Sequence, residues 1–136
     1  MILQGDHPMD IVTKKQLNIL IQLAEADKHF AKTEREMIFR IASERHFPAE
    51  TVNELIRNPE PIDTLGALSI EQKFDYLMSS IDLIFADHNI FDSEVLFCKN
   101  IAIKLGFKKS VIDYFIEHYG TKSREDFKQA ALKEYV

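Results

Sequence analysis

The sequence predicts an all-α protein, a single globular bundle of about seven helices built from two pseudo-symmetric three-helix repeats. Apolar residues recur at helical spacing along most of the chain. Glycine and proline, at four residues each, are scarce for a turn-rich β architecture. Two stretches sixty residues apart also share a pattern of acidic residues. We expect one domain over residues 1–136, with repeats at about 13–57 and 69–119, a connector at 58–68 and a C-terminal helix at 123–135.

The first two helices follow from capping signals and from the period of their apolar residues. We expect the first helix to start near Asp10 or Thr13, because Thr13 and Gln16 have the spacing of a capping box. Thr33 and Glu36 repeat this spacing and predict the start of the second helix. The first helix has a broad apolar face, as does the helix sixty residues later, which predicts that both lie at the centre of the bundle.

Proline and serine mark the next helices. Pro48 suits the first turn of a third helix, and the two prolines in the sequence NPEP at 58–61 end that helix. Ser69 and Gln72 form the next capping box and open the fourth helix. Ser93 is positioned to cap the fifth helix.

Two glycines and a serine delimit the last helices. Gly106 stands where a left-handed residue ends the fifth helix, the sixth helix ends at Gly120, and Ser123 starts a shorter seventh helix. Cys98 is the only cysteine and has apolar neighbours, so we expect a buried side chain rather than a nucleophile. A lone cysteine also excludes an intramolecular disulfide and a Cys-rich zinc site.

An internal duplication supports the two repeats. Residues 17–56 share ten identities with the stretch sixty positions later, where average residue usage gives about two or three by chance. Most of these identities are apolar positions of the predicted core. The informative pairs are acidic: Asp27 with Asp87, and Glu34 with Glu94.

The duplicated acids lie in different electrostatic surroundings. Glu34 and Glu94 fall in the first turn of a helix, where the helix dipole favours a carboxylate by ~0.3–1 kcal/mol. Asp27 and Asp87 follow the C-terminal end of a helix, where negative charge is disfavoured. Two explanations stand side by side. Each aspartate accepts backbone hydrogen bonds that shape a turn, or the four carboxylates bind a divalent cation such as Ca²⁺, Mg²⁺ or Mn²⁺.

The loops are not EF-hands. Counted from Asp87, the sixth position is Asp92 instead of glycine, and the twelfth is Cys98 instead of a bidentate glutamate. A metal would therefore have to bind between the two loops. His29 and His88 lie in these loops and either add nitrogen ligands or are plain surface residues.

Charge and motif content exclude several functional classes. The net charge of −5 is spread evenly over the chain, so no basic stripe is present for nucleic-acid binding. No apolar window reaches the ~18 residues of a membrane span, and the first residues lack the pattern of a signal peptide. We therefore expect a cytoplasmic protein without direct membrane insertion. There is no phosphate-binding loop, catalytic triad or metalloprotease helix motif, and we expect no enzymatic activity.

The repeated pattern Ala-Asp-x-x-apolar-x-x-x-Glu at a helical hairpin resembles the TerB-like tellurite-resistance family over roughly residues 13–118. The family's loop typically reads Ala-Asp-Gly, and here Lys28 and His88 replace the glycine. The resemblance implies an all-α fold and a bacterial, cytoplasmic role linked to chemical stress, including tellurite. Some members of that family act beside membrane-anchored protein partners or as domains attached to J-domain co-chaperones, and the resemblance implies no catalysis. The divalent metal suspected in the family would fall on four residues here: Asp27, Glu34, Asp87 and Glu94.

Two functional hypotheses follow from these observations. In the first, the chain is a stress-associated module that binds a divalent metal through its acidic loops. In the second, the loops are purely structural turns, and the chain is an adaptor that binds a protein partner through an exposed apolar patch. Four aromatic residues are candidates for this patch, with core packing as the alternative: Phe30, Phe91, Tyr114 and Tyr119.

Overall fold

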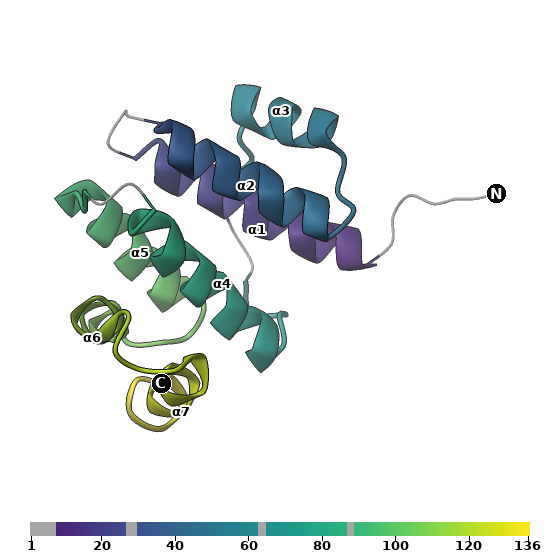
Figure 1. Ribbon diagram of the computed structural model, residues 1–136. Helices are drawn as coiled ribbons and strands as arrows, with labels where there is room; N and C mark the ends of the chain where they lie inside the picture. Colours follow the sequence, from purple (N-terminus) through teal and green to yellow (C-terminus); the bar gives the residue numbers. More distant parts are fainter. Residues whose placement is uncertain (1–7, 27–29, 63–64, 87–88) are drawn as a thin grey trace.

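The computed structural model describes residues 8–26, 30–62, 65–86 and 89–136 (Figure 1). Within these ranges the chain forms seven α-helices and no β-strand, which confirms the predicted all-α fold. None of the described helices is both long and apolar enough to cross a membrane. The helices are α1 (Pro8–Ala24), α2 (Lys32–Glu44), α3 (Ala49–Arg57), α4 (Ile70–Ile84), α5 (Asp92–Lys104), α6 (Ser110–His118) and α7 (Arg124–Glu134).

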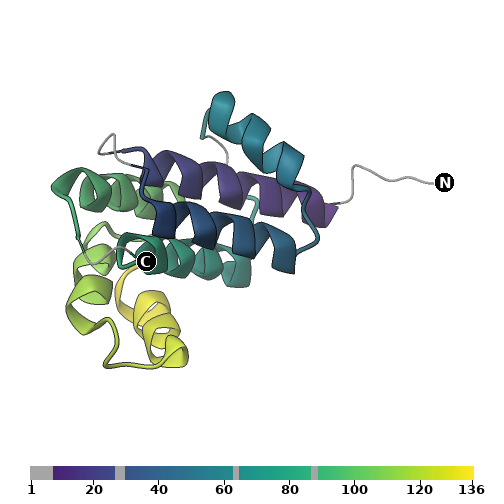
Figure 2. The ribbon, with the colours of Figure 1, turned by 45° about the horizontal axis from the view of Figure 1, so that its top comes forward.

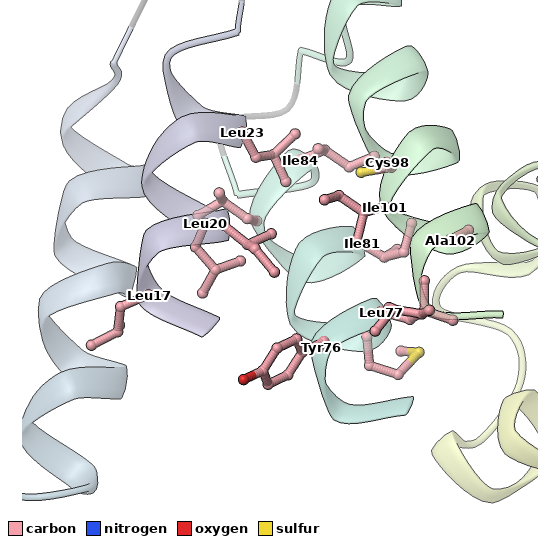
Figure 3. Close-up of a cluster of buried hydrophobic side chains, with 14 of the residues drawn as sticks. Leu17, Leu20, Leu23, Tyr76, Leu77, Ile81, Ile84, Cys98, Ile101 and Ala102 are labelled. Carbon is pink, nitrogen blue, oxygen red and sulfur yellow. The ribbon is translucent and has the colours of Figure 1, made fainter. Parts of the chain in front are cut away.

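Helices α1 and α4 form the centre of the bundle, as their broad apolar faces predict. They run side by side in the same direction: Gln16 reaches Ser79, and Leu23 lies near Ile84 further along both helices (Figure 3). Helix α1 also packs against α2, α3 and α5, while α4 packs against α2, α5 and α6. Figures 1 and 2 show α3 and the α6–α7 pair on opposite sides of this central pair.

The hydrophobic core follows the line where α1 and α4 meet (Figure 3). Each helix supplies several leucine or isoleucine side chains that are completely buried: Leu17, Leu20 and Leu23 from α1, and Leu77, Ile81 and Ile84 from α4. Burying one such side chain stabilises a fold by about 1.5–3 kcal/mol. The central pair therefore holds the other helices in place.

Of the two predicted starts of the first helix, the one near Asp10 lies two residues from the observed start at Pro8, and the one at Thr13 is wrong. Helix α1 already includes Pro8, so Thr13 lies inside the helix and is buried there. Gln16, its predicted capping partner, is also buried and bonds to other helices. The pair therefore has the spacing of a capping box by coincidence, since the Gln16 amide serves tertiary contacts.

The predicted caps of α2 and α5 are also wrong. Helix α2 begins one residue before Thr33, and α5 begins one residue before Ser93. The residues before these helices are Ala31 and Phe91, which have no polar side chain. The backbone N–H of each is satisfied instead by a glutamate three residues further on, so neither start needs a hydroxyl group.

The remaining termini agree better with the prediction. Ser69 caps α4, with its hydroxyl oxygen accepting from the Gln72 N–H at 3.1 Å. Ser123 caps α7 in the same way. Gly106 has a φ of 93° after α5, as predicted, and Gly120, with a φ of 83°, follows the end of α6. Pro48 immediately precedes α3 rather than lying within its first turn.

Candidate functional site

The two acidic loops lead into glutamates that close the first turn of a helix. The Glu34 carboxylate accepts a hydrogen bond from the Ala31 N–H at 3.0 Å, and the Glu94 carboxylate accepts one from the Phe91 N–H at 3.1 Å. Each glutamate is only 1% exposed. The expectation that both lie in a first turn is confirmed, and both carboxylates act as helix caps.

Only two of the four predicted metal ligands, Glu34 and Glu94, lie within the described residues. Asp27 and Asp87 lie outside the described residues, as do His29 and His88 of the same loops. In the part of the chain that the structure describes, no three His, Cys, Asp or Glu side chains are placed to hold one ion. The proposed metal ligation by Asp27, Glu34, Asp87 and Glu94 therefore stays a prediction.

A polar network that the sequence did not reveal links α1, α4, α7 and the end of α2. The Gln16 amide donates to Ser79 Oγ at 2.9 Å and to Asp75 Oδ2 at 3.1 Å, across from α1 to α4. Arg45, just after α2, donates to the Gln16 amide oxygen and to Asp75 Oδ2. Arg124 at the start of α7 donates to the other Asp75 oxygen at 2.9 Å. Asp75 is thereby neutralised by two arginines.

A groove runs along α2 and α4 above this network. It consists of two adjoining hollows of about 420 Å³ and 400 Å³. Met37, Arg40 and Asp82 line both hollows, which makes them one continuous depression. Tyr119 borders the first hollow and Arg124 the second.

One end of the groove is aromatic. The rings of Phe85 and Tyr119 stack with centroids 3.9 Å apart and an angle of 6° between the ring planes. The Tyr119 hydroxyl donates to Asp82 Oδ1 at 2.7 Å. Burial and this bond to Asp82 raise the pKa of Tyr119 from 10.0 to about 12. Tyr119 is therefore held as a neutral donor, and its ring forms a fixed apolar wall.

Some charged side chains in the groove have ion-pair partners, and others have none within the described residues. Asp75 pairs with Arg45 and Arg124 at the second hollow. Arg40 is exposed and has no ion-pair partner within the described part of the chain. Asp82 accepts from a neutral tyrosine hydroxyl, so its negative charge is not balanced by a cation there. Arg40 and Asp82 thus flank Met37 and the aromatic stack, and Glu36 and Glu44, four positions before and after Arg40, also line the hollows.

The predicted aromatic patch is largely absent. Of the four candidates only Phe91 is exposed. Phe30 is half-buried with the Arg35 guanidinium 4.8 Å above its ring, and Tyr119 belongs to the stack described above. Tyr114 is half-buried among the aromatic side chains that hold α7 on α6, including Phe127. Core packing therefore explains most of these residues.

Cys98 is buried, as predicted, with 1% exposure. Burial, with a smaller effect of the Glu94 charge, raises the pKa of its thiol from 9.0 to about 12. A thiolate is the nucleophilic form of cysteine. The Cys98 side chain is therefore a packing element and not a reactive group at neutral pH.

Comparisons with known proteins assign no family. Family models, curated proteins and solved structures were all searched, and none matches this chain. The resemblance to the TerB-like family rests on the repeated acidic pattern and stays a prediction. The candidate site is therefore defined by geometry alone, as the groove along α2 and α4.

Proposed function

We propose that the chain is a non-enzymatic protein-interaction module of TerB-like type that binds a peptide segment of a partner protein in the groove along α2 and α4. The observation that supports this is the groove's composition. Its floor is apolar at Met37 and at the stacked rings, and Arg40 lies beside it without an ion-pair partner within the described residues. In this proposal the buried glutamates are purely structural caps.

The groove chemistry indicates the kind of peptide it fits. An apolar side chain would cover Met37 and the edge of the Phe85–Tyr119 stack. A neighbouring acidic side chain would pair with Arg40, whose planar guanidinium suits a carboxylate. A segment with an apolar residue next to an acidic residue is thus the expected ligand. The link to bacterial chemical stress, including tellurite, belongs to this proposal through the family resemblance.

A displayed peptide library tests the groove. We expect the wild-type chain to enrich peptides with an apolar–acidic pair, and Arg40→Glu to select basic residues at the acidic position. For one enriched peptide, this substitution replaces an attraction with a repulsion and should weaken binding about tenfold. Arg57→Glu is the matched control, since Arg57 is exposed on α3 and lies outside the groove. A library without any consensus, or a consensus unchanged by Arg40→Glu, rejects the proposal.

The duplication is part of the proposal and has structural support. Helices α2 and α5 each have 13 residues and begin sixty positions apart. Helices α3 and α6 have nine residues each. The packing of α1 against α2, α3 and α5 also parallels that of α4 against α5, α6 and α2. Two pseudo-symmetric three-helix repeats would explain all three correspondences.

A divalent-metal site at the acidic loops is the second candidate function. The observation that favours it is the parallel course of α1 and α4, because the loops after them begin at the same end of the bundle. Thermal unfolding with Ca²⁺, Mg²⁺ or Mn²⁺ tests it: a metal at a hundred times its Kd should add ~2.7 kcal/mol. Combining Asp27→Asn with Asp87→Asn should abolish this gain, and Asp92→Asn should keep it. If neither a chelator nor any of the three ions changes the melting temperature, the metal site is rejected.

A further inference from the structure

Large apolar side chains are exposed around one helix. Within the described residues seven such side chains are exposed, and four of them lie between positions 90 and 103. Ile90 and Phe91, immediately before α5, are 39% and 38% exposed. Leu96 and Ile103, within α5, reach 60% and 54%. This concentration is unusual for a surface on which single apolar residues are normally scattered.

The two exposed residues within α5 form a regular strip. Leu96 and Ile103 are seven positions apart, so they lie on the same side of the helix about 10 Å apart along its axis. The exposed Asn100 lies between them on this side. The opposite side of α5 is buried in the core through Glu94, Cys98, Ile101 and Ala102. A seven-residue apolar spacing is the pattern through which one helix packs along another.

The surroundings of this strip are basic. Positions 95–112 contain four lysines and no acidic residue, in a chain whose net charge is −5. Lys99 pairs with Asp113 at 3.3 Å. The other three, Lys104, Lys108 and Lys109, have no ion-pair partner in the part of the chain that the structure describes.

The position of two lysines adds to this argument. Lys108 and Lys109 immediately precede α6, at a helix N-terminus. Positive charge is disfavoured there by the helix dipole, so folding alone gives no reason for lysine. An acidic ligand lying across α5 towards α6 would compensate these charges.

We propose that the α5 face, defined as Leu96, Ile103 and Lys104 together with Lys108 and Lys109 of the turn that follows α5, is a docking surface for an acidic amphipathic helix of a partner protein. The apolar side of that helix covers Leu96 and Ile103, and its glutamate or aspartate residues face the lysines. The surface is separate from the groove along α2 and α4, because none of its residues lines either hollow. The chain would then join two partners.

Charge placement favours a helix over a lipid surface or a second copy. Asp92 and Asp113 are exposed at the two ends of the acid-free stretch. A flat anionic membrane would be brought close to both aspartates. A partner helix can place a neutral or basic residue opposite Asp92, which lies on the same side of α5 as Leu96 and Ile103, and acidic residues opposite the lysines. A second copy in a symmetric contact would offer few carboxylates to the lysines, because this face holds only Asp92 at the start of α5 and Asp113, which already pairs with Lys99.

Fluorescence anisotropy with two synthetic helices tests the proposal. Both peptides carry leucine at heptad positions a and d, and the flanking positions are glutamate in one and lysine in the other. We expect saturable binding of the glutamate peptide and at least about tenfold weaker binding of the lysine peptide. Leu96→Glu with Ile103→Ser should abolish binding, and Lys104→Glu with Lys109→Glu should reverse the preference. Lys32→Glu with Arg57→Glu, an equal charge change on exposed residues of α2 and α3, should change neither.

Several outcomes would overturn the proposal. One is the absence of saturable binding up to about 1 mM of the glutamate peptide. Equal binding of the two peptides would show that the lysines do not select between them.

The other possible occupants, a membrane and a second copy of the chain, are tested with the same variants. Binding to phosphatidylserine vesicles that is lost with Leu96→Glu and Ile103→Ser would assign the face to a membrane. A concentration-dependent dimer in sedimentation that these substitutions dissociate would assign it to a second copy.

Discussion

Helices α2 and α5 bury the same positions and expose different chemistry. Each has 13 residues, and the buried residues of α2 (Glu34, Ile38, Ile41 and Ala42) lie sixty positions before those of α5 (Glu94, Cys98, Ile101 and Ala102). On the outer side, α2 carries Glu36 and Ser43 where α5 carries Leu96 and Ile103. The inner sides are therefore constrained by packing in one core, while the outer sides are free to diverge.

The largest expected effect contrasts two buried positions. Ile38 and Cys98 are 0% and 1% exposed at corresponding places. Ile38→Ala should destabilise the chain by about 2–5 kcal/mol, because it leaves a cavity in the core. Cys98→Ala removes less volume and should cost about 1 kcal/mol. Urea unfolding measures both, and equal losses would show that the two helices do not share the same depth of packing.

The second prediction concerns the two buried caps. Glu34→Ala and Glu94→Ala should each cost about 2 kcal/mol, because the backbone N–H of Ala31 or Phe91 loses its acceptor. The glutamine variants keep a side-chain oxygen and serve as controls with smaller losses. If alanine and glutamine at one position gave the same stability, the hydrogen bond to the N-cap would not be the reason for that glutamate.

The third prediction separates the helices by pH. The pKa of Cys98 is raised from 9.0 to about 12 by burial, and its counterpart Ile38 has no proton to lose. The unfolded chain therefore loses the thiol proton first, so stability is complete below about pH 9 and falls as the pH rises towards 12. Between about pH 8 and pH 10 the wild type should lose about 1.4 kcal/mol more than Cys98→Ala. Identical losses in urea unfolding at both pH values would contradict this account.

The fourth prediction concerns the residues after the two helices. Gly106 follows α5 with a φ of 93°, and His46 follows α2 with a φ of 58°. His46→Gly should stabilise the chain by about 1 kcal/mol, because only glycine adopts this conformation without strain. Gly106→Ala should destabilise it by a similar amount, although an added Cβ meets no atom within 4 Å. Thermal unfolding checks both signs, and a loss with His46→Gly would mean that the histidine side chain makes a stabilising contact.

The smallest expected effect is on the outer sides. Leu96→Glu and Glu36→Leu exchange the characters of exposed positions on α5 and α2, and each should change the free energy of unfolding by less than about 0.5 kcal/mol. Leu96→Glu alone should weaken the binding of the glutamate peptide to the α5 face. A large loss of stability with Leu96→Glu would show that this side chain belongs to the core.

The fold could be predicted because its signals are local. The apolar period along α1 and α4, the serine caps at Ser69 and Ser123 and the left-handed Gly106 act within a few residues of each other. At α2 and α5 the errors came from Thr33 and Ser93, where a hydroxyl residue stood beside the true start. A glutamate at the third helical position capped those helices instead, and the same residue type also suggested a metal ligand.

The groove could not be predicted from the sequence. Glu36, Arg40 and Glu44 are spaced by four residues on α2, which is the usual pattern of a solvated helix side with its own charge pairs. Only the packing of α2 against α4 places Arg40 beside Asp82 and next to the stacked ring of Tyr119. No local signal in the chain marks these residues as neighbours.

The sequence by itself determined the helices, their order and the sides that are buried, because hydrophobic period and capping depend on near neighbours in the chain. Tertiary structure alone decided how the buried polar groups are used. Gln16 and Asn18 are of residue types that are usually exposed. Here Gln16 donates a hydrogen bond to Ser79, and Asn18 makes hydrogen bonds with the backbone of Glu60. These partners are 63 and 42 positions away, a separation at which only the packed bundle brings donor and acceptor together.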